Sequence, residues 1–458
     1  MVSAIPMMGS LLLAGLLARG QSSVPAEPAV QAIVGAKVEV GDGRVLEKAT
    51  VVIRGGIIVA LGLDANVPKG AQILDGKGLT LTPGFIDGWT DKGVTAPAAK
   101  PDQDAAPSAA EFASASMREA NRKGIQPEVE ARYFLTLTED QNKPYREAGF
   151  TTAMVVPTGG YVSGVGTLVN LSGRPARETV VVSNTALAIN FDGNATGNGY
   201  PSALLGRIAQ VRQAFEDARW LQTSTSAFLA GGTQRPVSDP SLEALLPALT
   251  GKLPSAIEAD TPSQIDRALL IAREYGLKPI LVGGLQAYKR VDSVKGIPLI
   301  LGLNFGPEPK DEKKPDETPD DTPPDGKEAF TERSRLYNEA ARNAVVLQQA
   351  GIPFALSTHG SKDVGEFMTR LRATVKNGLP RAIVLRALTL DAAKTFKVDR
   401  LLGTLEVGKT ANVVAFTGDF LDEKTKVKMI YIDGHRIDPE AKPIPGAPAR
   451  PSGAGDLP

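Results

Sequence analysis

The chain has 458 residues, of which 42% are hydrophobic and 22% are charged, as expected of a globular protein with a sizeable core. Its 51 Lys and Arg residues balance 51 Asp and Glu residues, and this zero net charge argues against a nucleic-acid or membrane-surface binder. Because the chain has no cysteine, disulfides, thiolate metal sites and cysteine nucleophiles are excluded. With only His359 and His435, one chain cannot build a site from three or four imidazoles.

The amino terminus has the pattern of a signal peptide. Residues 5–17 are almost all apolar, and this stretch is too short to span a bilayer. Ala18 and Gly20 supply small residues before a cleavage point, although no Lys or Arg precedes the apolar stretch. We therefore expect residues 1–20 to be removed and the protein to be exported to the periplasm or the extracellular space, with no membrane span. The alternatives are a misplaced start codon or a buried hydrophobic arm.

Two β-rich stretches flank the rest of the chain. Residues 31–82 contain short Val- and Ile-rich runs broken by Gly and Asp-Gly, which is typical of hairpins. Residues 403–440 have the same character, with a turn at Asp433 and Gly434. Because neither stretch is large enough to be stable alone, we expect both to form one composite β-sandwich domain.

Between them, residues 83–402 alternate apolar runs with helical patterns. In the clearest helix, residues 261–276, Thr261 is the expected N-cap, Pro262 takes the first helical position and Gly276 ends the helix. A second helix is expected at 331–350. This alternation predicts an α/β fold, with a (β/α)8 TIM-type barrel as the leading architecture. The strands are expected at residues 152–156, 180–182, 256–259, 279–282, 298–303 and 353–357.

Two segments have compositions that do not favour order. Residues 306–327 are rich in proline and charge and interrupt the predicted barrel, and residues 441–458 are rich in Pro, Gly and Ala. We expect both to be disordered. Since the first segment follows a predicted strand, it would project from the face where a lid would lie, or it is a solvated insertion without a role.

Motifs at both ends of the predicted barrel resemble one family. Residues 75–87, which end in Pro-Gly-Phe-Ile-Asp, resemble the entry into the barrel of the amidohydrolase superfamily, and residues 403–416 resemble its return strand. Residues 148–157 and 200–218 resemble exported bacterial members grouped with imidazolonepropionase-like proteins. The resemblance covers roughly residues 32–437.

This resemblance implies a (β/α)8 barrel with a β-sandwich made from both chain ends. Members of the superfamily hydrolyse C–N bonds with one or two divalent metals, which polarise the carbonyl and lower the pKa of a bound water. The implied ligands are a His-x-His pair on strand one, single histidines on strands five and six, and an aspartate on strand eight.

This sequence departs from the implied ligand set at each position that can be aligned. Trp89 and Asp91 stand where the His-x-His pair is expected, and Glu258 takes the place of the strand-five histidine. Gly284 falls at the next position, and His359 replaces the strand-eight aspartate. We therefore expect a degenerate metal site.

A replacement metal site is the weaker alternative, because the remaining carboxylates and single imidazole suit Mg, Mn or Ca better than Zn. Otherwise these acids bond to the backbone or face water, and Trp89 fills the space of the lost metal. We expect no cofactor, with a divalent metal as the alternative. The candidate ligands would be Asp87, Asp91, Glu258, Asp260 and His359.

Polar residues after several predicted strands are candidates for ligand contact. The Gly-rich residues 158–166 lack the Gly-Lys-Ser/Thr ending of a phosphate loop, and we expect them to shape the mouth of the site. The candidate ligand-binding residues are Trp89, Tyr161, Ser163 and Asn190.

Two hypotheses for function follow. In the first, the protein is a hydrolase of C–N bonds in cyclic amide-like substrates, with Glu258 and His359 as acid–base groups and with weak or absent activity. In the second, it is a non-catalytic subunit that binds a small molecule or pairs with an active amidohydrolase homologue, as a homo- or hetero-oligomer. Fold alone does not decide between the two hypotheses.

Overall fold

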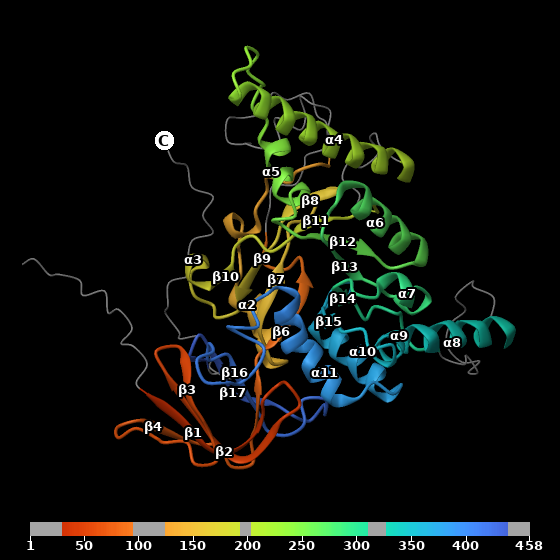
Figure 1. Cartoon of the computed structure of the whole chain (residues 1–458). Coiled ribbons are helices and arrows are strands. Elements are labelled where there is room, and N and C mark those ends of the chain that lie inside the picture. The colour runs from red at the N-terminus through yellow and green to blue at the C-terminus, as the bar shows by residue number, and fades with distance from the viewer. Residues whose placement is uncertain (1–29, 95–123, 193–202, 310–326, 438–458) are drawn as a thin grey trace, which may run out of the picture.

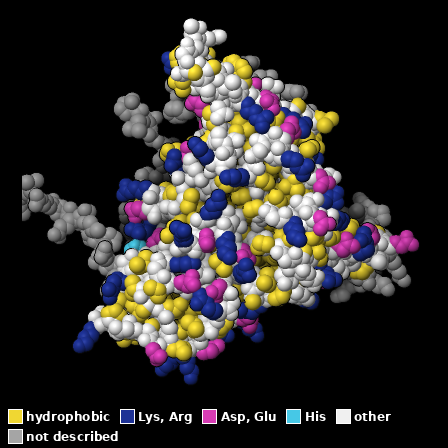
Figure 2. All heavy atoms as spheres, viewed as in Figure 1, with side chains coloured by type: hydrophobic (Ala, Val, Ile, Leu, Met, Phe, Trp, Pro, Cys, Tyr) yellow, Lys and Arg dark blue, Asp and Glu magenta, His cyan; other side chains and the backbone are white. Residues whose placement is uncertain are grey.

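A computed structural model of the chain describes residues 30–94, 124–192, 203–309 and 327–437, and it has a mixed α/β fold (Figure 1). Lys and Arg side chains are interspersed with Asp and Glu side chains on the face shown in Figure 2, as the balanced composition leads us to expect. None of the helices in these ranges is long and apolar enough to cross a membrane. The predicted signal peptide and carboxy-terminal tail lie outside the described residues, as do residues 310–326 of the predicted insertion.

One sheet is built by strands from both ends of the described chain. The order is β18-β17-β16-β5-β1-β2-β3, with β4 also paired to β1. The two ends meet where β5 pairs antiparallel with β16, Thr82 opposite Val414. The strands are β1 (Gln31–Glu39), β2 (Val45–Arg54), β3 (Ile57–Gly62), β4 (Gln72–Asp75), β5 (Thr80–Pro83), β16 (Val413–Phe416), β17 (Val427–Ile432) and β18 (His435–Ile437).

This sheet branches at β1. The first half of β1 pairs in parallel with β4 and the second half with β5, on either side of Gly35, whose φ of 78° favours glycine. The branched sheet encloses a core of its own that includes Ile33, Val51, Leu81 and Tyr431. Both predicted β-rich stretches therefore contribute to one hydrogen-bonded sheet. The exact domain boundaries stay predictions.

The central part of the chain forms two further sheets, a mixed four-stranded sheet and a mostly parallel six-stranded sheet. One has the order β10-β9-β7-β6, and the other the order β15-β14-β13-β12-β11-β8. All six apolar runs that were expected to form strands do so, although β14 and β15 are shorter than predicted. The strands are β6 (Phe85–Thr90), β7 (Phe150–Val155), β8 (Val162–Val165), β9 (Thr167–Asn170), β10 (Val180–Val182), β11 (Leu187–Ile189), β12 (Ser255–Ala259), β13 (Pro279–Gly283), β14 (Leu299–Leu301) and β15 (Ala355–Leu356).

The two central sheets share an interior. On one side, β8 and β9 are separated only by Gly166, and they pair with β11 and β7 respectively, so one bent segment belongs to both sheets. On the other side, β6 lies against β15, since a Cβ on Gly88 would be 3.0 Å from the carbonyl oxygen of Leu356. Among the described residues no backbone pairing joins β6 to β15, so the closed barrel stays a prediction.

The helices cover the outside of these sheets, and α4 projects well beyond them (Figure 1). The predicted helix 261–276 is confirmed as α6. Thr261 and Gln264 form a capping box, and Gly276 ends the helix with a φ of 68°. The helices are η1 (Ala131–Tyr133), α2 (Glu139–Glu147), α3 (Ala176–Thr179), α4 (Leu204–Leu229), α5 (Pro240–Leu249), α6 (Pro262–Tyr275), η2 (Ala287–Lys289), α7 (Val291–Val294), α8 (Lys327–Ala341), α9 (Asn343–Gln349), α10 (Val364–Lys376), α11 (Arg381–Leu388) and α12 (Leu390–Thr395).

The helix expected at 331–350 is two helices in the structure. α8 ends at Ala341, and α9 begins at Asn343, whose side chain accepts a hydrogen bond from the backbone N–H of Tyr288 and donates one to the carbonyl oxygen of Gly284. These tertiary contacts anchor the start of α9 to the loop after β13. The local sequence pattern does not reveal them, so the prediction of one continuous helix was wrong.

The bent segment that joins the two central sheets depends on Gly164. Its φ is 124°, and an added Cβ would lie 2.2 Å from the carbonyl oxygen of Val129. We expect Gly164→Ala to lower the free energy of unfolding by about 3 kcal/mol or more, because backbone strain adds to a clash that no side chain can relieve. Urea denaturation measures this loss. Gly43→Ala is the control, since Gly43 has a φ of 104° with nothing within 4 Å of an added Cβ, and equal losses would contradict the steric explanation.

Candidate active site

A cavity of about 750 Å³ opens at the carboxyl ends of the parallel strands. Asp91 follows β6, Pro157 follows β7, and His359 lies just beyond β15, while Glu258 is the fourth residue of β12. Ligands of parallel α/β proteins bind at this end of the sheet, where loops from several strands converge. The cavity therefore lies where the alternating pattern of the sequence predicts a site.

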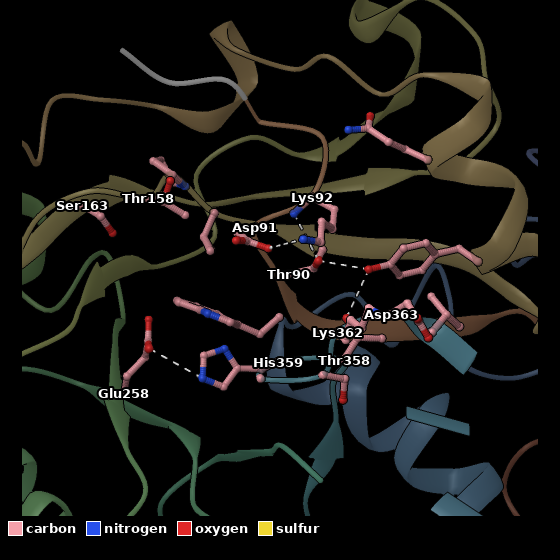
Figure 3. Close-up of a pocket in the computed structure, with 18 of the residues that line it drawn as sticks. Thr90, Asp91, Lys92, Thr158, Ser163, Glu258, Thr358, His359, Lys362 and Asp363 are labelled. Carbon is pink, nitrogen blue, oxygen red and sulfur yellow. Dashed lines mark hydrogen bonds and ion pairs between the residues drawn. The ribbon is translucent and has the colours of Figure 1, made fainter. Parts of the chain in front are cut away.

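A carboxyl, an imidazole and an amide lie together in the lining of the cavity, at what we call its inner end. The Nε2 atom of His359 lies 3.6 Å from Oε2 of Glu258, and the two side chains point toward each other (Figure 3). Asn190 donates a hydrogen bond from Nδ2 to the same Oε2 atom at 2.8 Å. The Oδ1 atom of Asn190 accepts from the backbone N–H of Asp192, which fixes the orientation of the amide. Three segments distant in sequence thus converge on one carboxyl group.

Burial and nearby negative charge determine the protonation of this group. Burial raises the pKa of Glu258 to about 7, and the negative charges of Asp260, Asp91 and Asp192 add to the increase. Burial also lowers the pKa of His359, which favours the neutral imidazole at neutral pH. At pH 7 the carboxyl is therefore close to half ionised, as a group that both accepts and donates protons should be.

A chain of hydrogen-bonded oxygens forms another wall of the cavity. The hydroxyl of Tyr145 lies 3.1 Å from Oγ1 of Thr90 and 3.2 Å from Oγ1 of Thr358. Thr358 donates from Oγ1 to Oδ2 of Asp87 at 2.6 Å and from its backbone N–H to Oδ1 at 2.8 Å. Burial raises the pKa of Asp87 to about 7 and also raises the pKa of Tyr145. Asp87 therefore holds the segment that carries His359.

Sequence reasoning missed three members of this chain, namely Thr90, Tyr145 and Thr358, as residues of the cavity wall. Tyr145 belongs to α2, which has no recognisable motif, and it reaches the site only because α2 packs beside β7. Thr90 and Thr358 each lie next to a residue that the alignment singled out. Because they are adjacent to Asp91 and His359 in the sequence, Thr90 and Thr358 could have been predicted to line the cavity.

Of the four predicted ligand-binding residues, three line the cavity and one lies outside it. Trp89, Ser163 and Asn190 line the cavity. Tyr161 does not. It is 1% exposed and belongs to the large hydrophobic core, with the guanidinium of Arg207 5.8 Å from its ring centroid. The structure therefore places Tyr161 in the core behind the Gly-rich loop, and its contact with a ligand stays a prediction.

Trp89 is the residue that stands at the first position of the expected His-x-His pair. Its side chain is 2% exposed and packs with Ile86, Val156 and Val282 in the interior shared by the two central sheets. A register shift between Asp87 and Thr90 lets Trp89 face the same interior as Ile86. The indole thus occupies space beside the cavity that a smaller imidazole would leave open.

The residues present do not fit the divalent metal that the resemblance implies. Asp87 is bonded to Thr358 and does not line the cavity, while the side chain of Asp91 is 56% exposed and lies 3.8 Å from the Nζ atom of Lys92. Asp260 also lies outside the lining, and its carboxylate accepts from the backbone N–H of Leu285. Within the described ranges, no three His, Asp or Glu side chains are close enough to hold a metal ion together.

Comparison with known proteins gives a family match for one part of the chain and similar solved structures for most of it. Residues 330–437, which include β15, His359 and the return strands, match the model of the Amidohydrolase family. No curated protein matches the chain. An amidohydrolase from Thermotoga maritima MSB8 has a similar structure, with a TM-score of 0.70 and 21% sequence identity, covering 89% of this chain and 99% of that chain.

Two further solved structures share the fold at lower similarity. A Xaa-Pro dipeptidase with bound methionine has a TM-score of 0.51 and 15% identity, covering 90% of this chain and 100% of that chain. Molinate hydrolase has a TM-score of 0.52 and 15% identity, covering 94% of this chain and 99% of that chain. These findings support the predicted superfamily: residues 330–437 match the Amidohydrolase family, and the chain shares the fold of solved amidohydrolases. Its assignment to the imidazolonepropionase-like branch stays a prediction.

Proposed function

We propose that the cavity is the small-molecule site of a hydrolase-type protein in which the metal centre of the superfamily has been replaced. The observation that carries this proposal is the convergence of Glu258, His359 and Asn190 at the inner end of the cavity. The family match and the hydrolases that share the fold support a hydrolase-type function. Export of the mature protein, inferred from residues 1–20, is a separate part of the proposal.

The proposal includes a barrel architecture for the strands from β6 to β15. The bent segment β8–β9 and the close approach of Gly88 to Leu356 support a closed ring. Such a ring would have one antiparallel member, since β9 runs antiparallel to β7 and β8 runs antiparallel to β11. A ring of this kind would make the cavity its mouth and the cluster around Trp89 its packed interior.

Glu258 is the group that would perform the acid–base chemistry. In its ionised form it can take a proton from a water molecule while the water oxygen forms a bond to the carbonyl carbon. As the C–N bond breaks, the protonated carboxyl can return that proton to the leaving nitrogen. A carboxyl with a pKa of about 7 suits both steps at neutral pH. Asn190 would hold the carboxyl in place.

The same geometry predicts that hydrolysis is slow. The oxyanion formed by attack on a carbonyl needs positioned hydrogen-bond donors, and each missing donor costs about 10²–10³-fold in rate. The hydroxyl of Thr358 already donates to Asp87, and one of the two N–H groups on Nδ2 of Asn190 already donates to Glu258, so few of these donors are available to an oxyanion. We therefore propose weak hydrolysis of C–N bonds in cyclic amide-like substrates, with a non-catalytic ligand-binding role as the alternative.

An assay with cyclic amides and dipeptide-like amides at pH 7 tests the proposal. We expect low turnover that neither a chelator nor added Zn or Mn changes, and that Glu258→Gln lowers by about 100-fold because proton transfer is lost. Glu147→Gln, on the exposed side of α2, is the matched control and should leave turnover unchanged. Turnover that a chelator abolishes would contradict the proposal, and binding without turnover would favour the non-catalytic alternative.

A further inference from the structure

The inner end of the cavity presents a carboxylate oxygen that lacks a protein donor. Oε2 of Glu258 faces both Asn190 and His359, at 2.8 Å and 3.6 Å. No described residue donates a hydrogen bond to Oε1 of the same carboxyl. Because Glu258 lines the cavity, a bound molecule can reach this oxygen. A buried carboxylate with an unused acceptor favours a ligand that brings a donor.

The charges of the lining residues determine whether the cavity favours a cationic or an anionic ligand. Five carboxyl residues line it against two lysines, and no arginine is among its described lining residues. His359 adds little positive charge, since burial lowers its pKa. Asp260 and Asp192 lie behind the lining and raise the pKa of Glu258 by repulsion. The lining carboxyls are Asp91, Asp140, Glu258, Asp363 and Glu366, and the lysines are Lys92 and Lys362.

Three of these charged lining residues, namely Asp91, Lys92 and Glu366, are already paired. The Nζ atom of Lys92 lies 3.8 Å from Asp91, and Glu366 accepts from Arg370, a residue outside the lining, at 3.0 Å. Glu258 itself has no Lys or Arg within ion-pair distance among the described residues. The inner end therefore has a negative potential that disfavours an anionic ligand and attracts a cation.

Apolar surface lies next to this carboxylate. Trp89, Val156 and Pro157 line the same cavity, together with Pro144 of α2. These side chains give the cavity an apolar wall against which the apolar body of a ligand can pack while its charged group bonds to the carboxylate. A volume of about 750 Å³ leaves room for a body larger than the cationic group alone.

We propose that the cavity takes an organic cation, an ammonium or amidinium group on an apolar body, with an N–H directed to Oε1 of Glu258 and the apolar part against Trp89. This inference rests on the proposed function in one respect, namely that the cavity is the ligand site. It adds the chemical class of the ligand. In a substrate for hydrolysis, the cationic group would be a substituent that binds Glu258 and positions the molecule. The amide bond to be cleaved would lie in another part of the same molecule.

Three probes that share a phenyl ring and differ in charge test this class. They are benzylammonium, benzyl alcohol and benzoate. The chain has two tryptophans, so the Trp220→Phe variant leaves Trp89 as the sole indole fluorophore, and Trp220 is a 65% exposed residue of α4 outside the cavity. At pH 8, where Glu258 is mostly ionised, we expect the Kd of benzylammonium to be lower than that of benzyl alcohol by about tenfold or more. Benzoate should bind most weakly.

Glu258→Gln in the Trp220→Phe background provides the decisive comparison. It should remove the preference for benzylammonium and leave the affinity for benzyl alcohol within about twofold, because only the charge-assisted hydrogen bond is lost. Glu147→Gln, which removes a surface charge of α2 outside the lining, should leave the preference intact. Isothermal calorimetry repeats the measurement without relying on Trp89.

The outcomes separate the two proposals. Equal or tighter binding of benzyl alcohol or benzoate would overturn the cation class and leave the cavity as a ligand site. A preference for benzylammonium that persists in Glu258→Gln would also overturn the inference, because the carboxylate would not be its cause. Failure of all three probes to bind would contradict the proposed ligand site as well.

Discussion

Replacing Asp87 by asparagine is expected to stabilise the protein at pH 8 and not at pH 4. The side chain of Asp87 is fully buried, and burial raises its pKa from 3.8 to about 7. The folded state therefore holds a proton between about pH 4 and pH 7 that the unfolded chain releases. The stabilising contribution of Asp87 is fully present below its unfolded pKa and is lost as the pH rises through the folded pKa. Asparagine, which carries no charge, avoids that loss.

The expected difference is about 2–4 kcal/mol in the free energy of unfolding at pH 8 in favour of Asp87→Asn, from a shift of roughly three pH units. An asparagine can keep both contacts with Thr358, since Oδ1 can accept from its backbone N–H and Nδ2 can donate to its hydroxyl. Urea denaturation of both proteins at several pH values measures this difference.

Asp140→Asn is the control for Asp87→Asn, because Asp140 is exposed and its replacement should not change the pH profile. Glu258→Gln should act in the same direction as Asp87→Asn, since burial raises the pKa of Glu258 to about 7 as well. A constant loss of stability in Asp87→Asn at every pH would show that its hydrogen bonds outweigh the cost of its buried charge.

Replacing Trp89 by alanine is expected to destabilise the protein by about 3–5 kcal/mol, the range for deleting a buried aromatic side chain. Trp89 is 2% exposed and packs within the interior shared by the two central sheets. Urea denaturation at one pH gives the loss directly. Trp220→Ala is the matched control, because Trp220 is 65% exposed and its loss should change stability by about 0.5 kcal/mol or less.

The same experiment tests the role of Trp89 at the position where the resemblance implies an imidazole. If Trp89→Ala and Trp220→Ala had equal stabilities, Trp89 would not support the interior, and its presence at the His-x-His position would need another explanation. A large loss confined to Trp89→Ala would agree with an indole that fills space beside the cavity. Trp89→His should then lose less stability than Trp89→Ala, since an imidazole leaves a smaller void.

Local chemistry made parts of the fold predictable from the sequence. The helix α6 shows its boundaries through Thr261, Pro262 and Gly276, each of which acts within one turn of the helix. All six strands that were predicted from apolar runs form in the structure, because strands buried on both faces need continuous apolar sequence. The break between α8 and α9 depends instead on contacts of Asn343 with a distant loop, which no local pattern encodes.

The candidate site was predictable where it depends on the ends of parallel strands. Glu258, Asn190 and His359 follow or end such strands, and their convergence follows from the parallel order of β11 to β15. Tyr145 was not predictable, because its position depends on how a whole helix packs. The inward direction of the Tyr161 side chain was not predictable either, because in a Gly-rich loop it depends on backbone angles that the sequence does not fix.

We propose that an acid–base pair and an indole stand where the resemblance to the superfamily implies a metal centre. Equilibrium dialysis of the full-length protein against Zn, followed by elemental analysis, tests this claim most directly. Because Trp89 offers no ligand, Asp87 is bonded to Thr358, and Glu258 faces a single imidazole, the account predicts far less than one zinc per chain. One tightly bound zinc per chain that is lost in both Glu258→Gln and His359→Ala would contradict the account.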